Sequence, residues 1–195
     1  MRISLLLPTT LLLLLPCVIA GAQTVEVGKD LTLSAGVFLL GDPEYRQNLG
    51  PAVGFTIDKR IRRNKGSELS VRAGWFRASE SQAGWYAGES ANNELDIVPV
   101  SLVKRYGHAY SSQSGTGSYH GYGAGFSVTR LRVNGTYYSE WTEEYYDYSF
   151  SEDNVRLTFT ALTGWRFSKS AFAEIDLCMS GEESSGIIAS IGARF

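Results

Sequence analysis

The chain has 195 residues, a formal net charge of −2 and 44% hydrophobic residues. This length suits one domain or one barrel better than two domains. We see no basic face of the kind that nucleic-acid binding needs, so we expect no nucleic-acid partner.

The first 22 residues match a secretory signal peptide. Arg2 supplies the positive start, Leu5–Leu15 the apolar stretch, and 20–22 the small-residue cleavage site. The apolar stretch is shorter than the roughly 20 residues that a transmembrane helix needs. A lipoprotein signal ending at Cys17 is the alternative, although Pro16 stands where a small residue is expected. We therefore predict an exported chain, with a mature domain over 23–195.

Segments that alternate apolar and polar residues follow along the whole mature chain. In 155–167, for example, Val155, Leu157 and Phe159 share one parity and Arg156 and Thr158 share the other. This is the period of a β-strand, and about 9 to 11 such residues can cross a bilayer. The eight predicted strands are 31–39, 53–58, 69–75, 94–106, 121–128, 155–167, 173–178 and 187–195.

Two positions disturb this alternation. Pro99 would remove a hydrogen bond from the sheet, so we expect a bulge or an irregular pairing there. Arg130 falls on an apolar parity, which predicts either a bulge near Thr129 or a strand that has already left the membrane.

The connections between these segments alternate between long and short. Long loops on one side and tight turns on the other are typical of outer-membrane barrels, and an even strand count places both chain ends on the periplasmic side. The segment 107–118 does not fit, because it should be a tight turn. Asn134-Gly135 within the long third loop, 134–154, is a strong turn signal.

The signal peptide, the eight alternating segments, "YHGYGAGFSV" at 119–128 and "IIASIGARF" at 187–195 resemble the superfamily of small bacterial outer-membrane β-barrels. The resemblance implies an all-β, eight-stranded antiparallel up-and-down transmembrane barrel, a monomer in contact with outer-membrane lipid. It also implies recognition by the barrel-assembly machinery through Ile187, Ile191 and Phe195.

A barrel wall places the second parity of each strand in the lumen. Its charged residues are Asp30, Asp58, Arg60, Glu68, Arg72, Arg156, Arg166, Glu174, Asp176 and Arg194. Eight strands leave room only for side chains, so we predict no open pore. The predicted lumen charge network comprises Asp58, Arg60, Arg72, Arg156, Arg166, Glu174, Asp176 and Arg194.

The competing fold is a soluble β-sandwich or lipocalin, which would bury the apolar rows and expose the charged ones. Aromatic residues near the row ends, Trp75, Tyr106 and Trp165, favour the barrel because they fit the girdles of a lipid-facing band.

The sequence offers little catalytic chemistry. The family includes lipid A deacylases and acyltransferases, in which a histidine acts with a serine. Ser118 and His120 share a parity, but the serine comes first, and the pair should lie at the periplasmic end. Two histidines do not make a metal site. We therefore predict no catalytic residue, metal or cofactor, and we interpret Cys178 as a small buried side chain.

The most distinctive surface is the acidic and aromatic third loop. Its candidate contact residues are Tyr137, Trp141, Glu143, Glu144 and Tyr146. Such residues suit a surface-interaction role through the outward loops, with a ligand that the sequence does not identify. Two alternatives stay open: a lipid A-modifying enzyme on the same scaffold, and a narrow, porin-like channel.

Overall fold

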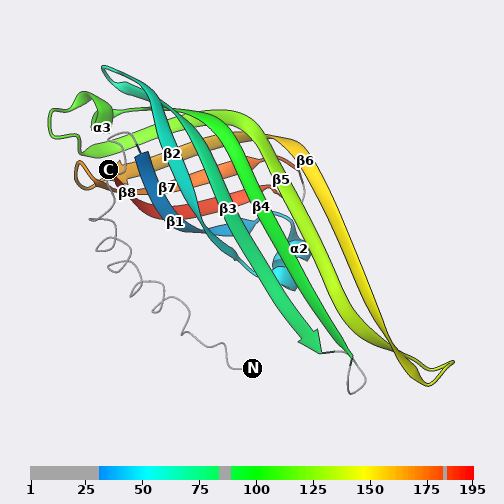
Figure 1. Cartoon of the computed structure of the whole chain (residues 1–195). Helices are drawn as coiled ribbons and strands as arrows, with labels where there is room; N and C mark the ends of the chain where they lie inside the picture. Colours follow the sequence, from blue (N-terminus) through cyan, green and yellow to red (C-terminus); the bar gives the residue numbers. More distant parts are fainter. Residues whose placement is uncertain (1–30, 84–88, 182–183) are drawn as a thin grey trace.

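A computed structural model describes residues 31–83, 89–181 and 184–195. These residues form a closed barrel in which each strand pairs antiparallel with its neighbours in the chain (Figure 1). The elements are β1 (Leu31–Leu40), α2 (Pro43–Leu49), β2 (Ala52–Asn64), β3 (Ser67–Ala83), β4 (Ser90–Tyr106), α3 (His108–Ser111), β5 (Gly117–Ser139), β6 (Glu144–Arg166), β7 (Ala171–Met179) and β8 (Gly186–Arg194). The predicted eight-stranded up-and-down barrel is confirmed. The predicted signal peptide and Asp30 lie outside the described residues.

The barrel closes between its first and last strands. Their pairing runs from Thr32 opposite Arg194 to Leu40 opposite Gly186. Beyond it, the Phe195 backbone N–H donates to the Leu31 carbonyl at 2.9 Å. Closure matters because hydrocarbon offers no partner to an unpaired backbone group. We call the end where β1 begins and β8 ends the base of the barrel.

The wall is apolar outside and charged inside. On β6, the exposed fractions of Val155, Leu157 and Phe159 are 69%, 74% and 56%. Inside, Glu174 is 2% exposed and Asp176 is 1% exposed. A water-soluble sandwich would show the reverse distribution.

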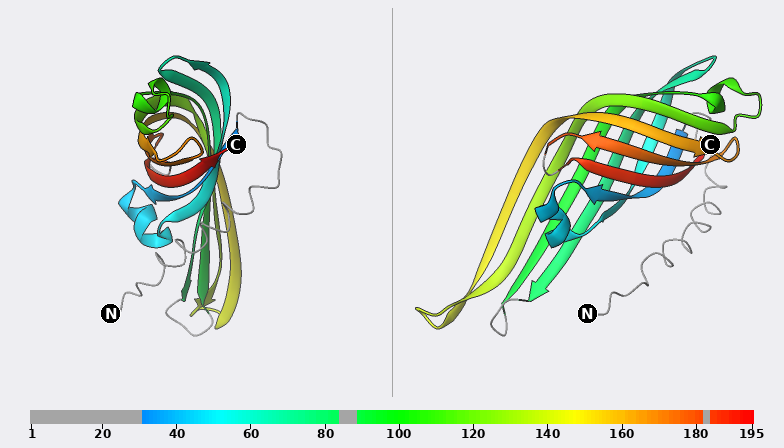
Figure 2. Two further views of the ribbon diagram at one scale, coloured as in Figure 1. Left: turned by 90° about the vertical axis from the view of Figure 1, so that its left-hand side faces the viewer. Right: turned by 180° about the vertical axis from the view of Figure 1, so that it is seen from behind.

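Four neighbouring strands extend far beyond the others at the end opposite the base (Figure 2). β5 and β6 have 23 residues each, whereas β7 and β8 have 9 each. β6 pairs with β7 only from Phe159 to Arg166. We call this extension, residues 77–83, 90–96, 129–139 and 144–154, the projecting sheet.

The long third loop is therefore mostly strand. β5 and β6 pair up to Ser139 opposite Glu144, so the connection is only 140–143. The turn predicted at Asn134-Gly135 is wrong, because Gly135 pairs with Tyr148 within the ladder.

Strand register settles the two disturbed positions. The pairing of β5 with β4 and β6 continues without a shift through Thr129 and Arg130, so there is no bulge and this part of β5 belongs to the projecting sheet. At Pro99 the pairing of β3 with β4 is interrupted, between Ala73 opposite Val100 and Phe76 opposite Ile97, yet its register is the same on both sides.

The lumen is filled in layers. An apolar cluster lies where the lumen meets the projecting sheet, and α2 contributes Leu49 to it. Its other members are Phe38, Leu40, Ala52, Phe76, Ala78, Leu95, Ile97, Cys178 and Ile188, of which Ala78 and Leu95 belong to the projecting sheet. The predicted network of charges therefore fills only the part nearer the base. Across the described residues, no helix is long and apolar enough to span a membrane.

The segment 107–118 folds back into the base instead of forming a tight turn. Its helix α3 places Ala109 and Tyr110 in the interior, where Tyr110 packs edge-on against Tyr119 with ring centroids 5.7 Å apart. The segment 107–118 therefore occupies part of the lumen at the base.

Candidate functional site

Two arginines and three carboxylates meet in the middle of the lumen. Arg72 donates from Nε and Nη2 to Asp58 at 3.0 Å each, from Nη1 to Asp176 at 2.5 Å, and from Nη2 to Glu174. Arg105 donates to Glu174 Oε2 at 2.9 Å and to Asp58 Oδ1 at 3.1 Å. β2, β3, β4 and β7 supply these five groups, so this middle cluster ties the two sides of the barrel together.

A second cluster lies nearer the base, around Glu68. This carboxylate accepts a hydrogen bond from Arg194 and lies 3.7 Å from Arg166 Nη2 and 4.0 Å from Arg60 Nη1. Arg166 also donates to the Tyr110 hydroxyl at 3.0 Å, with its guanidinium 4.3 Å from that ring's centre. One carboxylate therefore serves three guanidinium groups.

Little space is left between the two clusters. The cavity that both line has a volume of about 10 Å³, which is room for roughly one water molecule. Side chains of the two clusters therefore fill most of this part of the lumen.

The two clusters include seven of the eight residues of the predicted network. Arg156 is not brought in: it is exposed, beside Gly181 near the other end, and no ion pair joins it to another described residue. Sequence reasoning missed Arg105. Arg105 has the same parity as the inward Ser101 on β4, and this parity could have identified Arg105 as an inward residue.

A row of alternating charges crosses the outer surface where the projecting sheet leaves the apolar wall. Arg77 lies opposite Asp96, Asp96 opposite Arg130, and Arg130 opposite Asp153. Both arginines bind bidentately, at 2.7 and 2.9 Å to Asp96 and at 2.6 and 2.8 Å to Asp153. We call these four residues the charge belt. It separates an apolar surface from a polar one.

The charge belt is further held by its neighbours. Trp75, just below it, donates from Nε1 to Asp96 at 3.1 Å, and Arg77 lies over the Trp75 ring. At Asp153, the hydrogen bond from Arg130 lowers the carboxyl pKa below its usual value. An indole and a row of bound charges at one level are what an apolar–water boundary selects.

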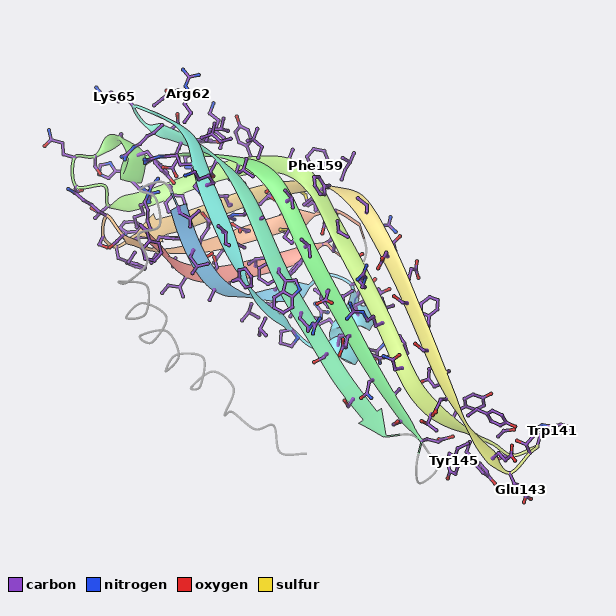
Figure 3. The ribbon with its side chains drawn as sticks, viewed as in Figure 1. Arg62, Lys65, Trp141, Glu143, Tyr145 and Phe159 are labelled. Atoms are coloured by element: carbon purple, nitrogen blue, oxygen red, sulfur yellow. The ribbon has the colours of Figure 1, made fainter. Side chains whose placement is uncertain are left out.

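The tip of the projecting sheet gathers the predicted contact residues. Tyr137 and Tyr146 are cross-strand partners with ring centroids 5.7 Å apart, and Trp141 in the turn is 98% exposed. Glu143 and Glu144 lie in and beside the same turn (Figure 3). The tip thus combines exposed rings with carboxylates on a regular hairpin. Glu140, Glu143, Glu144 and Asp147 lie at this tip, and Glu152 and Asp153 lie on the same hairpin beside the charge belt.

The histidine–serine pair lies near the start of β5. Ser118 and His120 lie on the outer surface near the base, and no hydrogen bond joins them within the described chain. The His120 ring instead contacts Tyr106 edge-on, with centroids 4.1 Å apart. The described residues also contain no group of three or more potential metal ligands.

The predicted assembly residues lie on the outer surface of the closing strand and at its end. Ile187 and Ile191 are 43% and 37% exposed, and Phe195 follows β8 directly.

No family model matches the chain, and no curated protein matches its sequence. Among solved structures, it is similar to Ail, the attachment invasion locus protein of Yersinia pestis, solved in complex with the heparin analogue sucrose octasulfate. The identity is 9% and the TM-score 0.50, over 85% of this chain and 97% of Ail. The fold is that of a small outer-membrane β-barrel.

A second structure of Ail gives a TM-score of 0.49 at 11% identity, with the same coverage. At these identities the likeness concerns the outer-membrane barrel fold. The subfamily of this barrel is unresolved.

Proposed function

We propose that the protein is a non-catalytic outer-membrane barrel that holds its projecting sheet outside the cell to contact a positively charged partner. The observation that carries this proposal is the wall of exposed apolar side chains around a charged interior, which ends at the charge belt. Above that belt, the same strands continue as a polar, acidic and aromatic sheet.

The apolar wall has a polar boundary at each end. The charge belt marks the outer boundary. Towards the base the outward positions of β2 and β4 become Lys59 and Lys104, with Tyr106, Tyr122 and Trp165 at a similar level. Such a band between aromatic girdles matches the hydrocarbon layer. With the base in the periplasm, the projecting sheet faces outward.

The charge of the tip indicates the class of partner. From Val133 to Val155 the chain has acidic residues and no lysine or arginine. Carboxylates attract cationic groups and speed their encounter, and exposed tyrosine and tryptophan rings bind lysine and arginine side chains by cation–π contact. Ail was solved with a sulfated polyanion. The opposite charge here leads us to propose a basic protein segment as the partner.

Binding of a decalysine peptide to the barrel in nanodiscs of zwitterionic lipid tests this function. We expect saturable binding that weakens about tenfold in E140Q/E143Q/E144Q, because three carboxylates near the peptide are lost. The Y137A/Y146A variant should also bind the peptide more weakly than the unmodified protein. This loss should be larger at high salt, where the charges are screened and the rings supply a larger share of the binding.

The matched control removes hydroxyls from the same hairpin, in S139A/S149A/S151A. It should bind like the unmodified protein. Equal binding by all these variants, or no binding by the unmodified barrel, would contradict the proposed role.

The two alternatives have separate tests. A lipid A-modifying enzyme would change the mass of lipid A on expression, and H120A would abolish that change. A channel would give discrete conductance steps in a planar bilayer. The filled lumen leads us to expect no conductance steps. Because no hydrogen bond joins Ser118 to His120 within the described chain, we also expect no change in lipid A mass.

A further inference from the structure

The base of the barrel opens into a cationic hollow. This cavity has a volume of about 520 Å³, and the arginines of the Glu68 cluster form part of its lining. Its lining residues come from β2, β6, β8, the 107–116 connection and the 167–170 turn. Its lining residues are Arg60, Arg63, Ser112, Gln113, Gly115, Arg166, Lys169, Ser170, Arg194 and Phe195. We call it the basal pocket.

The charge of the basal pocket is not balanced by its described surroundings. Five of its lining residues are cationic and none is acidic. Glu68, behind the lining, offsets one charge, and a carboxylate on Phe195, the last residue of the chain, would offset another. Neither Arg63 nor Lys169 has an ion-pair partner among the described residues. Cations held close together without counter-charges repel one another, and an anion between them would relieve this repulsion.

A β-bulge aims one of these cations into the pocket. Arg60 pairs with Ser70 and Arg62 with Leu69, so Ile61 is the extra residue. Without the bulge, Arg60 and Arg63 would point to opposite faces. With it, Arg63 lies opposite the inward Glu68, and both arginines line the pocket. Bulges commonly re-aim side chains at functional sites.

Two further cations, Arg166 and Arg194, are held in place by hydrogen bonds and ion pairs. Arg166 is fixed by Tyr110 and Glu68, and Arg194 by Glu68. Lys169 reaches from the 167–170 turn towards the other connection, where its Cγ lies 3.6 Å from the position of a Cβ on Gly115. Guanidinium groups fixed in this way lose little entropy when they bind an oxyanion.

We propose that the basal pocket binds a phosphate-bearing anion at the periplasmic mouth of the barrel. Guanidinium forks match phosphate oxygens, the Gln113 side chain adds a neutral donor, and the volume suits a small molecule. Because five cations surround the pocket, it favours an anion with more than one charge. The site is at the opposite end from the projecting sheet and does not depend on its role.

Calorimetric titration with tripolyphosphate tests this site on the barrel in nanodiscs of zwitterionic lipid. We expect saturable binding that weakens about tenfold or more in R63Q/K169Q, which removes two cations that hold no described residue in place. The control R62Q/K65Q removes the same charge from the hairpin of β2 and β3 that also carries Arg63 (Figure 3), at two positions outside the pocket lining. It should change the affinity by less than about twofold.

Nanodiscs that contain phosphatidylglycerol separate the two sources of phosphate. Unchanged tripolyphosphate binding there identifies a soluble anion as the ligand. If phosphatidylglycerol weakens tripolyphosphate binding by the unmodified barrel but not by R63Q/K169Q, a lipid headgroup occupies the same pocket. No saturable binding in zwitterionic nanodiscs, or equal weakening by both variant pairs, overturns the proposal.

Discussion

The middle cluster of the lumen joins three carboxylates to two arginines. Each guanidinium contacts at least two of the carboxylates. Glu174 is fully inside and bridges Arg72 and Arg105, which face it from two strands. Buried charges are costly unless they are paired, and removal of Glu174 would take a directly bound counter-charge from both guanidinium groups. The cluster therefore favours one arrangement of the strands around the lumen.

We predict that Glu174→Gln destabilises the folded barrel by about 3 kcal/mol, since two buried guanidinium groups lose a shared counter-charge. Urea titration of the barrel in detergent measures this change. Glu152→Gln, on the exposed projecting sheet, should cost less than about 0.5 kcal/mol. Similar losses for the two variants would show that the cluster is not a source of stability.

The inward glycines of β5 illustrate a second constraint on single residues. A Cβ on Gly125 would lie 2.0 Å from the Val100 carbonyl oxygen. Because that contact is with the backbone of the neighbouring strand, no side-chain rotation relieves it.

We predict that Gly125→Val lowers the yield of refolded barrel by more than half, as read from the heat-modifiable band on a gel, because overpacking of this size costs roughly 1–3 kcal/mol or more. Ala124→Val, on the exposed side of the same strand, should refold normally. If Gly125→Val refolds as well as Ala124→Val, there is more space between Gly125 and the Val100 carbonyl than the 2.0 Å contact implies.

At the scale of elements, the charge belt divides each of the four long strands into a membrane part and a projecting part. The outward-facing residues of these strands are apolar below the belt and polar above it. The antiparallel ladder continues through both parts. Backbone hydrogen bonds between strands therefore hold the projecting sheet together. Its outward side chains are polar because they face water instead of lipid.

Shortening the hairpin tests this division. Deletion of 136–147, with a two-residue Asn-Gly turn in their place, removes the tip but leaves the ladder below it. We expect the shortened protein to refold into a heat-modifiable barrel and to lose decalysine binding. Failure to refold would mean that the tip contributes to closure of the barrel.

The charge belt also predicts a pH dependence. Arg130 lowers the pKa of Asp153, so the folded carboxyl binds a proton less readily than the unfolded one. The stabilisation is present above the ordinary aspartate pKa and is lost as pH falls through the lower, folded value.

We expect the carboxyl NMR signal of Asp153 to titrate below about 3.9, the usual aspartate pKa. Arg130→Gln should move the midpoint back towards that value. A midpoint at the usual value in both proteins would show that this ion pair does not persist in solution.

Sequence periodicity predicts the membrane part of these strands better than the projecting part. A lipid-facing strand needs an apolar residue at every second position, and this is the signal that located all eight strands. Above the belt the outward positions are polar and the apolar residues, such as Leu95, Leu131 and Val133, lie on the other face, so the outward apolar row ends although the strand continues. The preference of Asn134-Gly135 for a turn was outweighed by continuous pairing with β6.

The lumen and the base were only partly predictable for related reasons. Most inward charges follow from parity, but Arg105 was missed on a strand that Pro99 made hard to recognise. The basic run "KRIRRNK" at 59–65 was visible, yet alternation alone assigns Arg60 and Arg63 to opposite faces. Only the bulge at Ile61, which depends on pairing with β3, brings them together.

For the whole molecule, the distribution of side chains is the reverse of that in a water-soluble protein. The barrel hides charges in a lumen filled by two clusters and an apolar layer, and it exposes its large apolar side chains. Burial of that outer surface in lipid stabilises the barrel, since transfer of apolar surface from water is favourable at about 25 cal/mol per Å².

Spin-label accessibility along the outward positions of β6 tests this distribution most directly. In protein with Cys178→Ala, single cysteines at positions 147, 149, 151, 153, 155, 157 and 159 would carry nitroxide labels in lipid bilayers. We predict that the labels at 155, 157 and 159 are reached by oxygen and not by a water-soluble nickel complex. The labels from 147 to 151 should show the opposite, with the crossover at Asp153. Nickel access at 157 equal to that at 149, or shielding of 157 from both reagents, would contradict a lipid-facing wall.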